Sequence, residues 1–180
     1  MNKRFLNKTV IVTGSGSGIG ETTAMKFAEE GANVVIAELN DISGTEVSKR
    51  INKQGGNSIF IKTDVSQFES VNKMANQTVK QFGSLDILIN NAGINVFAEP
   101  LKMSENEWKR AFSVDLDGVW FGCKAALPFM LNQKKGSIVN VASVHGIQII
   151  PNCFPYPVAK HGVIGLTCLL YTSPSPRDNR

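Results

Sequence analysis

Histidine and cysteine are scarce in this sequence, which has two histidines and three cysteines among 180 residues. The cysteines, Cys123, Cys153 and Cys168, are odd in number and lack the paired spacing of zinc ligands. The pattern predicts neither a metal site nor a disulfide framework. It favours a reducing compartment, and we expect a cytoplasmic protein.

Long hydrophobic runs are also missing. The longest apolar stretches have the length of a β-strand, so the sequence shows no membrane span and no signal peptide. The net charge is only +4, and the basic residues are scattered along the chain. A solvated surface explains them better than a nucleic-acid site. The length suits one domain, for which we expect no nucleic-acid or membrane partner.

Glycine, in contrast, is concentrated near the N-terminus. Residues 13–20 read TGSGSGIG and lie between a short apolar strand, 9–12, and a helical pattern, 21–30. In that order, glycines let the backbone approach a pyrophosphate and the helix N-terminus offers it free N–H groups. Glycines also serve ordinary turns, but the flanking elements favour dinucleotide binding. The candidate contacts are Gly14, Ser15, Ser17, Gly18, Ile19 and Gly20.

A second strand, 33–37, ends at Glu38, about twenty residues beyond the glycine loop. A carboxylate at this position accepts hydrogen bonds from the adenosine ribose and repels a 2′-phosphate. The loop carries Ser15 and Ser17 where a phosphate-binding loop would carry Arg or Lys. These observations favour NAD over NADP as the cofactor. A solvated carboxylate at a strand end is the alternative for Glu38.

The rest of the chain alternates between helical and strand patterns. A longer helix begins after Ser104, which forms a capping box with Glu107, and runs to about residue 131 with a break near 117–118. The alternation predicts an α/β fold with a Rossmann-like, doubly wound parallel sheet. Its remaining elements are expected at 42–53 and 67–82 (helices) and at 58–61 and 86–89 (strands).

Ser143, Tyr156 and Lys160 have the types and the spacing for carbonyl–alcohol redox chemistry. Tyr156 and Lys160 are four residues apart, so on a helix they share a face. Ser143 ends an apolar run, 137–143, that is typical of a buried parallel strand. A phenol titrates near pH ~10 and becomes a useful base only beside positive charge. Tyr156 would then exchange the alcohol proton while Ser143 holds the same oxygen.

Together these motifs resemble the short-chain dehydrogenase/reductase family, of the single-domain type. The resemblance covers about residues 7–167. It implies an NAD(P)-dependent oxidoreductase that acts on an alcohol or ketone and assembles as a homodimer or homotetramer. It also implies adenine and ribose contacts at the pair Asp64-Val65 and in the NNAG segment, residues 90–93. The resemblance makes Ser143, Tyr156 and Lys160 catalytic. The implied cofactor contacts beyond the glycine loop and Glu38 are Asp64, Val65, Asn91, Ala92, Gly93, Tyr156 and Lys160.

One position departs from the family pattern. The family usually places a catalytic Asn in the helix after NNAG, where it supports a water in the proton relay from Lys. Counting back from Ser143 and Tyr156 places Asp115 there. Asp can fill a role that depends on helix distortion and an exposed carbonyl, whereas a role for the side-chain amide would be lost. We expect Asp115 to belong to the catalytic group.

The substrate is not readable from these motifs. The resemblance implies that the choice of substrate depends on the loop after Ser143 and on a C-terminal segment. His145 lies two residues after Ser143 and could line the substrate cleft with Ser143 and Tyr156, although a packed or solvated loop histidine is more common. We expect a secondary alcohol, with a sugar or polyol as the preferred kind, and the alternative is the substrate of a 3-oxoacyl carrier-protein reductase.

The last residues, 168–180, read CLLYTSPSPRDNR and leave the family pattern. The family's last strands, nicotinamide loop and substrate segment are not found in this sequence. The tail is similar to the translation of a transposase sequencing adapter, so we expect an incomplete domain over 1–167 and a non-native tail; a divergent C-terminus is the alternative. Two readings of function follow. The parent protein is an NAD-dependent oxidoreductase, or this chain is an inactive fragment or nucleotide-binding module.

Overall fold

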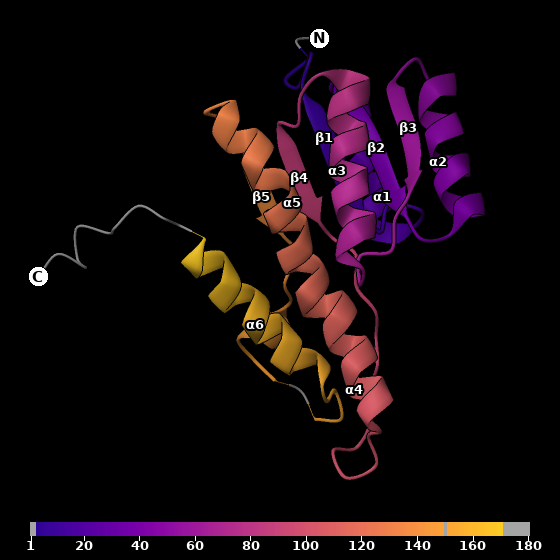
Figure 1. The fold of residues 1–180 in the computed structure, drawn as a ribbon. Coiled ribbons are helices and arrows are strands. Elements are labelled where there is room, and N and C mark those ends of the chain that lie inside the picture. The colour runs from indigo at the N-terminus through magenta and orange to yellow at the C-terminus, as the bar shows by residue number, and fades with distance from the viewer. Residues whose placement is uncertain (1–2, 150, 171–180) are drawn as a thin grey trace, which may run out of the picture.

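A five-stranded parallel sheet forms the centre of the molecule (Figure 1). The computed structural model describes residues 3–149 and 151–170. The strand order is β3-β2-β1-β4-β5, with the first strand in the middle. This order confirms the expected Rossmann-like, doubly wound sheet. The strands are β1 (Thr9–Thr13), β2 (Asn33–Glu38), β3 (Asn57–Lys62), β4 (Ile87–Asn90) and β5 (Ser137–Asn140).

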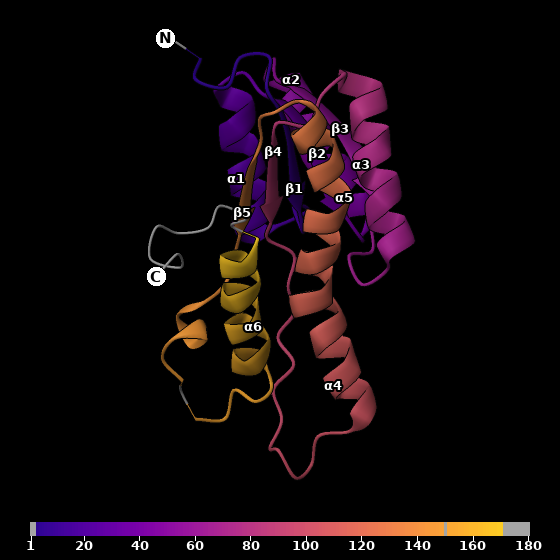
Figure 2. The same ribbon diagram turned by 60° about the vertical axis from the view of Figure 1, so that its left-hand side comes forward.

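Helices cover both faces of the sheet because its central strands alternate two sets of apolar side chains. On β1, Val10 and Val12 pack with α1 and α2, whereas Ile11 packs with α3 and α5 on the opposite face. Figures 1 and 2 show these two layers on either side of the strands. The helices are α1 (Gly18–Glu29), α2 (Asp41–Lys53), α3 (Phe68–Phe82), α4 (Glu105–Phe112), α5 (Gly118–Asn132) and α6 (Tyr156–Leu169).

The long helix expected from Ser104 to about residue 131 does not break near 117–118. It starts with the predicted capping box between Ser104 and Glu107, and α4 then passes into α5 through a π-helical turn, Ser113–Asp117. Such a turn widens the helix by one residue instead of ending it. It brings the side chain of Asp115 into the interior, where it is 1% exposed.

Two other expected boundaries were wrong. The strand before Ser143 ends at Asn140, because its partner β4 ends at Asn90 and the ladder has no further pair. Ser143 therefore lies three residues beyond the strand, where it caps a 3₁₀ turn, Val144–Gly146. Helix α1 begins at Gly18 instead of residue 21. Helix α6 extends two residues past residue 167, where the domain was expected to end. Most of the expected tail, residues 168–180, lies outside the described residues.

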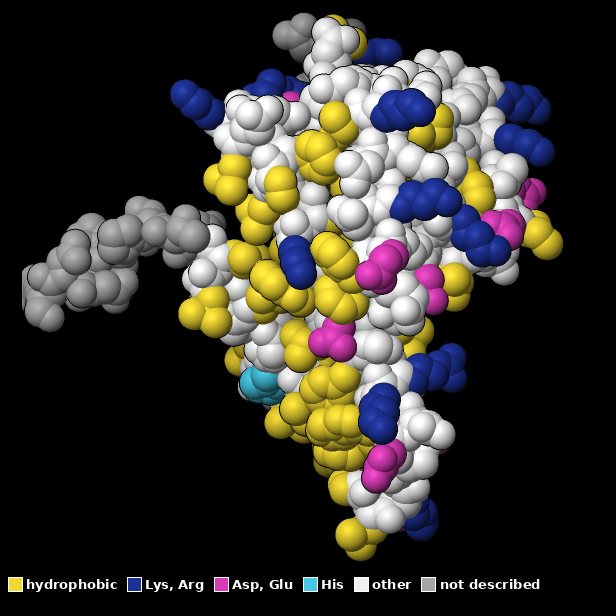
Figure 3. All heavy atoms as spheres, in the orientation of Figure 1, with side chains coloured by type: hydrophobic (Ala, Val, Ile, Leu, Met, Phe, Trp, Pro, Cys, Tyr) yellow, Lys and Arg dark blue, Asp and Glu magenta, His cyan; other side chains and the backbone are white. Residues whose placement is uncertain are grey.

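Helices α4 and α6 extend beyond the carboxyl ends of the strands (Figure 1). Figure 3 shows hydrophobic side chains gathered over the face formed by α4, α5 and α6. These helices carry two partly exposed tryptophans, Trp108 on α4 and Trp120 on α5, which are 38% and 40% exposed. Within residues 3–149 and 151–170, no helix has both the length and the apolar character needed to cross a membrane.

Candidate active site

A cleft of about 430 Å³ lies at the carboxyl ends of the parallel strands. Chains that follow β1, β2, β3 and β4 meet there, which is where open α/β sheets bind their ligands. Most of the cofactor contacts expected from the sequence line it. The lining residues are Gly14, Ser17, Gly18, Ile19, Gly20, Glu38, Leu39, Thr63, Asp64, Val65, Asn91, Ala92, Gly93, Ile94 and Val114.

The glycine loop has the geometry of an anion-binding helix start. Gly14 and Gly18 have positive φ angles of 62° and 57°, a conformation that glycine adopts without strain. Ser17, the N-cap of α1, makes no side-chain cap hydrogen bond, so the first turn keeps N–H groups free for a ligand. A Cβ on Gly18 would meet nothing within 4 Å. The loop thus presents open backbone to the cleft, as a pyrophosphate requires.

Ser15 is the one member of the predicted loop set that the structure does not bring to the cleft. Its side chain is fully buried, and its hydroxyl donates to the carbonyl oxygen of Val12 at 2.6 Å. This bond satisfies the hydroxyl inside the turn and directs it away from any ligand. The Ser15 side chain therefore supports the shape of the loop, and the expected cofactor contact at Ser15 stays a prediction for its backbone.

Glu38 lines the cleft, and its carboxylate is not a solvated group. One oxygen accepts the backbone N–H of Gly16 at 3.0 Å, and the other accepts those of Leu39 and Asn40 at 2.9 and 3.1 Å. Glu38 thus connects the end of β2 to the glycine loop. The negative charge stands at the edge of the cleft where the loop and β2 meet.

The NNAG segment after β4 is tied to the same loop. The Asn91 amide donates to the backbone oxygens of Thr13 and Gly14 at 2.9 and 3.2 Å. In return, the Thr13 hydroxyl accepts the backbone N–H groups of Asn91 and Ala92, both at 3.0 Å. Asn91 therefore holds the cleft wall through its side chain.

Asp64, on the other side of the cleft, is fixed by its own loop. Its carboxylate accepts the backbone N–H and the hydroxyl of Ser66 at 3.0 and 2.7 Å. Val65 beside it packs near Gly118, where a Cβ would lie 3.1 Å from the valine side chain. This acidic–apolar pair lines the cleft as the sequence predicts.

Two of the predicted catalytic side chains, Tyr156 and Lys160, lie together in the first part of α6, and the loop that carries Ser143 packs beside them. Lys160 Nζ lies 5.4 Å from the centre of the Tyr156 ring, which confirms that the two share a helix face. The ring of His145 meets the Tyr156 ring edge-on, with centroids 6.0 Å apart. The backbone N–H of His145 donates to Ser143 Oγ at 3.2 Å, so this loop connects the serine to the tyrosine. Phe97 packs on Tyr156 in the same edge-on manner, at 6.0 Å.

Asp115 and Lys160 form a buried pair behind Tyr156. Asp115 Oδ1 lies 3.9 Å from Lys160 Nζ, and their side chains are 1% and 4% exposed. Burial raises the pKa of the Asp115 carboxyl, while a hydrogen bond from the Ile94 N–H and the charge of Lys160 oppose that shift. Burial likewise lowers the pKa of Lys160, and Asp115 opposes it. Lys160 also donates to the Val141 carbonyl at 3.2 Å.

Sequence reasoning missed several members of the site. Leu39, Thr63 and Ile94 each adjoin a predicted contact, so proximity to the motifs was the available signal. Thr13 was quoted only as the first residue of the loop, yet its hydroxyl anchors the NNAG segment. Val114 adjoins Asp115, so its signal was proximity to an expected catalytic residue and not to an expected cofactor contact; it lies in the π-helical turn and lines the cleft.

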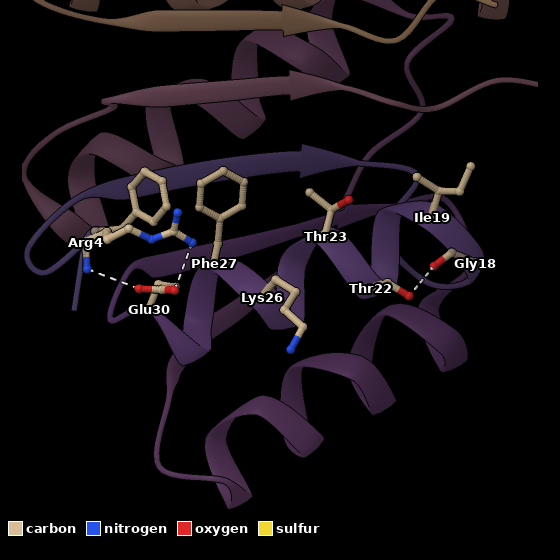
Figure 4. A pocket seen from close by; sticks show the side chains of 9 residues that line it. Arg4, Gly18, Ile19, Thr22, Thr23, Lys26, Phe27 and Glu30 are labelled. Carbon is tan, nitrogen blue, oxygen red and sulfur yellow. Dashed lines mark hydrogen bonds and ion pairs between the residues drawn. The ribbon is translucent and has the colours of Figure 1, made fainter. Parts of the chain in front are cut away.

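A larger hollow of about 670 Å³ lies along the outer side of α1 (Figure 4). Phe5 and Phe27 line it, and the ion pair between Arg4 and Glu30 stands at one end. It shares Gly18 and Ile19 with the cleft but none of the expected catalytic residues. The smaller cleft, in contrast, is lined by most of the expected cofactor contacts, so it is the candidate site.

The fold, the glycine loop and the Ser143, Tyr156 and Lys160 group define a dinucleotide-binding Rossmann domain with the residues of an alcohol oxidoreductase. The sequence model of the family described as short chain dehydrogenase matches residues 8–176, and the chain belongs to this family. The match ends within the expected tail, beyond the described residues.

Two curated relatives and one solved structure show how far the similarity extends. A short chain dehydrogenase/reductase, astE, of Aspergillus oryzae is 43% identical over 89% of this chain and 62% of its own length. The meso-2,3-butanediol dehydrogenase of Serratia marcescens is 41% identical over 91% of this chain and 64% of its own length. A short chain dehydrogenase/reductase of Burkholderia phymatum, solved in complex with NAD, is 34% identical with a TM-score of 0.91, over 93% of this chain and 60% of that one. The chain thus spans less than two thirds of each.

Proposed function

We propose that the protein of which this chain is a part is an NAD-dependent oxidoreductase that interconverts a secondary alcohol and a ketone. The observation that carries the proposal is the grouping of Tyr156, Lys160 and Ser143 beside a cleft with a free helix N-terminus. When bound, the nicotinamide accepts or supplies the hydride. The cofactor fits because the glycine loop leaves open backbone toward the cleft and the lining carries Glu38, Asp64 and Asn91.

Tyr156 is the proton carrier in this proposal. In oxidation it takes the hydroxyl proton of the alcohol, and in reduction it returns that proton to the ketone oxygen. Lys160 places positive charge 5.4 Å from the centre of the phenol ring, beside the group that exchanges the proton. Phe97 and His145 pack edge-on to the same ring and restrict its orientation.

Ser143 holds the reacting oxygen. Its Oγ already accepts the N–H of His145, so the hydroxyl hydrogen is left to donate to the substrate. His145 would line the substrate side, since its ring lies against Tyr156. The similarity to a meso-2,3-butanediol dehydrogenase supports a secondary alcohol with a neighbouring hydroxyl, of the polyol type, as the substrate class.

The proposed assembly is a homodimer or homotetramer in the cytoplasm. The exposed apolar face over α4, α5 and α6 supports it, because a surface of that kind is commonly a subunit contact (Figure 3). We also propose that the tail from residue 168 is not native to the protein. Under this proposal, the 180-residue chain alone is inactive, and turnover requires the full-length protein.

The experiment compares Tyr156→Phe with the unchanged full-length protein in NADH turnover on a panel of secondary alcohols and ketones. Removal of a general acid–base group lowers kcat by about 10²- to 10⁴-fold, while NADH binding, followed by fluorescence, persists. Thermal unfolding of Tyr156→Phe, compared with that of the unchanged protein, is the control that the substitution leaves the fold intact. A Tyr156→Phe variant that keeps most of its turnover would assign the proton to another group.

A further inference from the structure

The carboxylate of Asp115 stands where the family pattern has a neutral amide, and the structure places it against Lys160. We propose that Asp115 is the counterion of Lys160 and keeps its ammonium charged inside the protein. The inference rests on the proposed function, in which that charge acts on Tyr156. Asp115 is thus a positioning residue that works through Lys160 and touches neither substrate nor cofactor.

The first step of the argument is burial. Lys160 is 4% exposed at its side chain, and an isolated ammonium in such a place tends to lose its proton. The Val141 carbonyl at 3.2 Å offers only a dipole. The Asp115 carboxylate at 3.9 Å offers a full opposite charge in an environment that screens it weakly.

The second step is that the chain holds the carboxylate in this place. The π-helical turn brings Asp115 into the interior, and the Ile94 N–H donates to Oδ1 at 3.0 Å. Gly93 lies against the pair, since a Cβ there would be 2.8 Å from Asp115 Oδ1 and 3.6 Å from Lys160 Nζ. The other oxygen, Oδ2, is buried without a hydrogen-bond partner among the described residues. The Ile94 N–H and the ammonium of Lys160 therefore compensate the charge together, and Lys160 is the member of the two that carries a full positive charge.

The other ionisable groups near α6 do not replace Asp115. Tyr156 on the same helix is the group that Lys160 serves, and His145 from the 3₁₀ turn packs on that tyrosine. His161 pairs through Nδ1 with the Pro157 carbonyl oxygen at 2.8 Å. The charged residues of α4, which also packs near α6, are all exposed; they are Glu105, Glu107, Lys109 and Arg110. Among these groups, Asp115 is the acidic one that lies in position to pair with Lys160.

The test measures the ionisation of Lys160 directly. Lysine labelled with ¹³C at Cε is incorporated, and the Lys160 resonance is identified by its loss in Lys160→Arg. We expect Asp115→Asn to lower the titration midpoint of Lys160 by about 1 to 3 pH units, as removal of an adjacent opposite charge does. Asp117→Asn, two residues further along and exposed, is the matched control and leaves the midpoint in place. An unchanged midpoint in Asp115→Asn overturns the proposal.

A second measurement needs no variant and covers the case in which Asp115→Asn fails to fold. Carboxyl-labelled aspartate reports whether Asp115 is ionised at pH 7 in the unchanged protein. An ionised carboxyl supports the ion pair, and a protonated one overturns it. Neither titration depends on turnover. If the ion pair titrates as expected but the enzyme is inactive, only the proposed function is refuted. If the enzyme is active but the titration midpoint of Lys160 is the same with and without the Asp115 carboxylate, only this inference is refuted.

Discussion

The amide of Asn91 donates to the backbone oxygens of Thr13 and Gly14, and so ties the segment after β4 to the glycine loop after β1. The two strands are neighbours in the sheet, which brings their carboxyl ends together. Both carbonyls would otherwise be left unpaired in a part-buried position. Asn91 is thus as important for the shape of the loop as the glycines themselves.

The loop leaves no room at Gly20, and this predicts a sharp contrast between two Gly→Ala variants. A Cβ on Gly20 would overlap the Gly14 carbonyl and lie 2.6 Å from Asn91 Nδ2, whereas a Cβ on Gly165 in α6 meets nothing within 4 Å. We expect Gly20→Ala to lower the free energy of unfolding by about 1–3 kcal/mol and to weaken NADH binding.

Gly165→Ala is the matched control for Gly20→Ala. It should raise the free energy of unfolding by about 0.5–1 kcal/mol, because alanine is the better residue inside a helix. Urea denaturation of both variants provides the measurement. Equal stabilities would mean that the contact between Gly20 and Gly14 is relieved at no cost.

Cofactor choice is predicted to depend on Glu38. A 2′-phosphate would meet the carboxylate at the end of β2, so we expect NAD to be preferred over NADP by at least about tenfold in kcat/KM, or about 1.4 kcal/mol. Glu38→Gln should narrow this preference because it removes the charge at nearly constant shape. Glu46→Gln, on the exposed side of α2, should leave it unchanged. Equal kcat/KM values for the two cofactors in the unchanged protein would contradict the prediction.

The sheet and most of the cleft could be predicted from the sequence because both depend on local patterns. Short continuous apolar runs identify buried strands, and glycines followed by a helix identify the loop. The end of β5 could not be predicted, since it depends on where its partner β4 stops at Asn90. The buried hydroxyl of Ser15 depends on a turn that closes on Val12. The inward position of Asp115 depends on a π-helical turn that leaves no mark in the hydrophobic pattern.

Asp115 should make the stability of the fold depend on pH in a defined direction. Burial raises the pKa of its carboxyl above the unfolded value, so the folded state binds that proton more tightly. The resulting stabilisation is complete below about pH 4, which is the pKa of an aspartate in the unfolded chain. It is lost as the pH rises through the pKa of Asp115 in the folded protein. The free energy of unfolding of the unchanged protein, relative to Asp115→Asn, should therefore fall from about pH 4 toward neutral pH.

Urea denaturation at a series of pH values measures this difference. Asp117→Asn supplies the baseline for an exposed aspartate on the same helix. A difference between the unchanged protein and Asp115→Asn that stays constant with pH would show that Asp115 titrates alike in the folded and unfolded states.

The exposed apolar face of α5 leads to a prediction about assembly. Trp120 is 40% exposed on this face, and Leu131 near the end of the same helix is 71% exposed. If α5 joins subunits through its exposed apolar side chains, a charge at position 120 must be desolvated on association, which is costly without a partner of opposite sign. We expect Trp120→Lys to reduce the mass of the full-length protein to that of a monomer in analytical ultracentrifugation, while Trp120→Phe keeps the oligomer. A Trp120→Lys protein that remains oligomeric at low concentration would place the contact elsewhere.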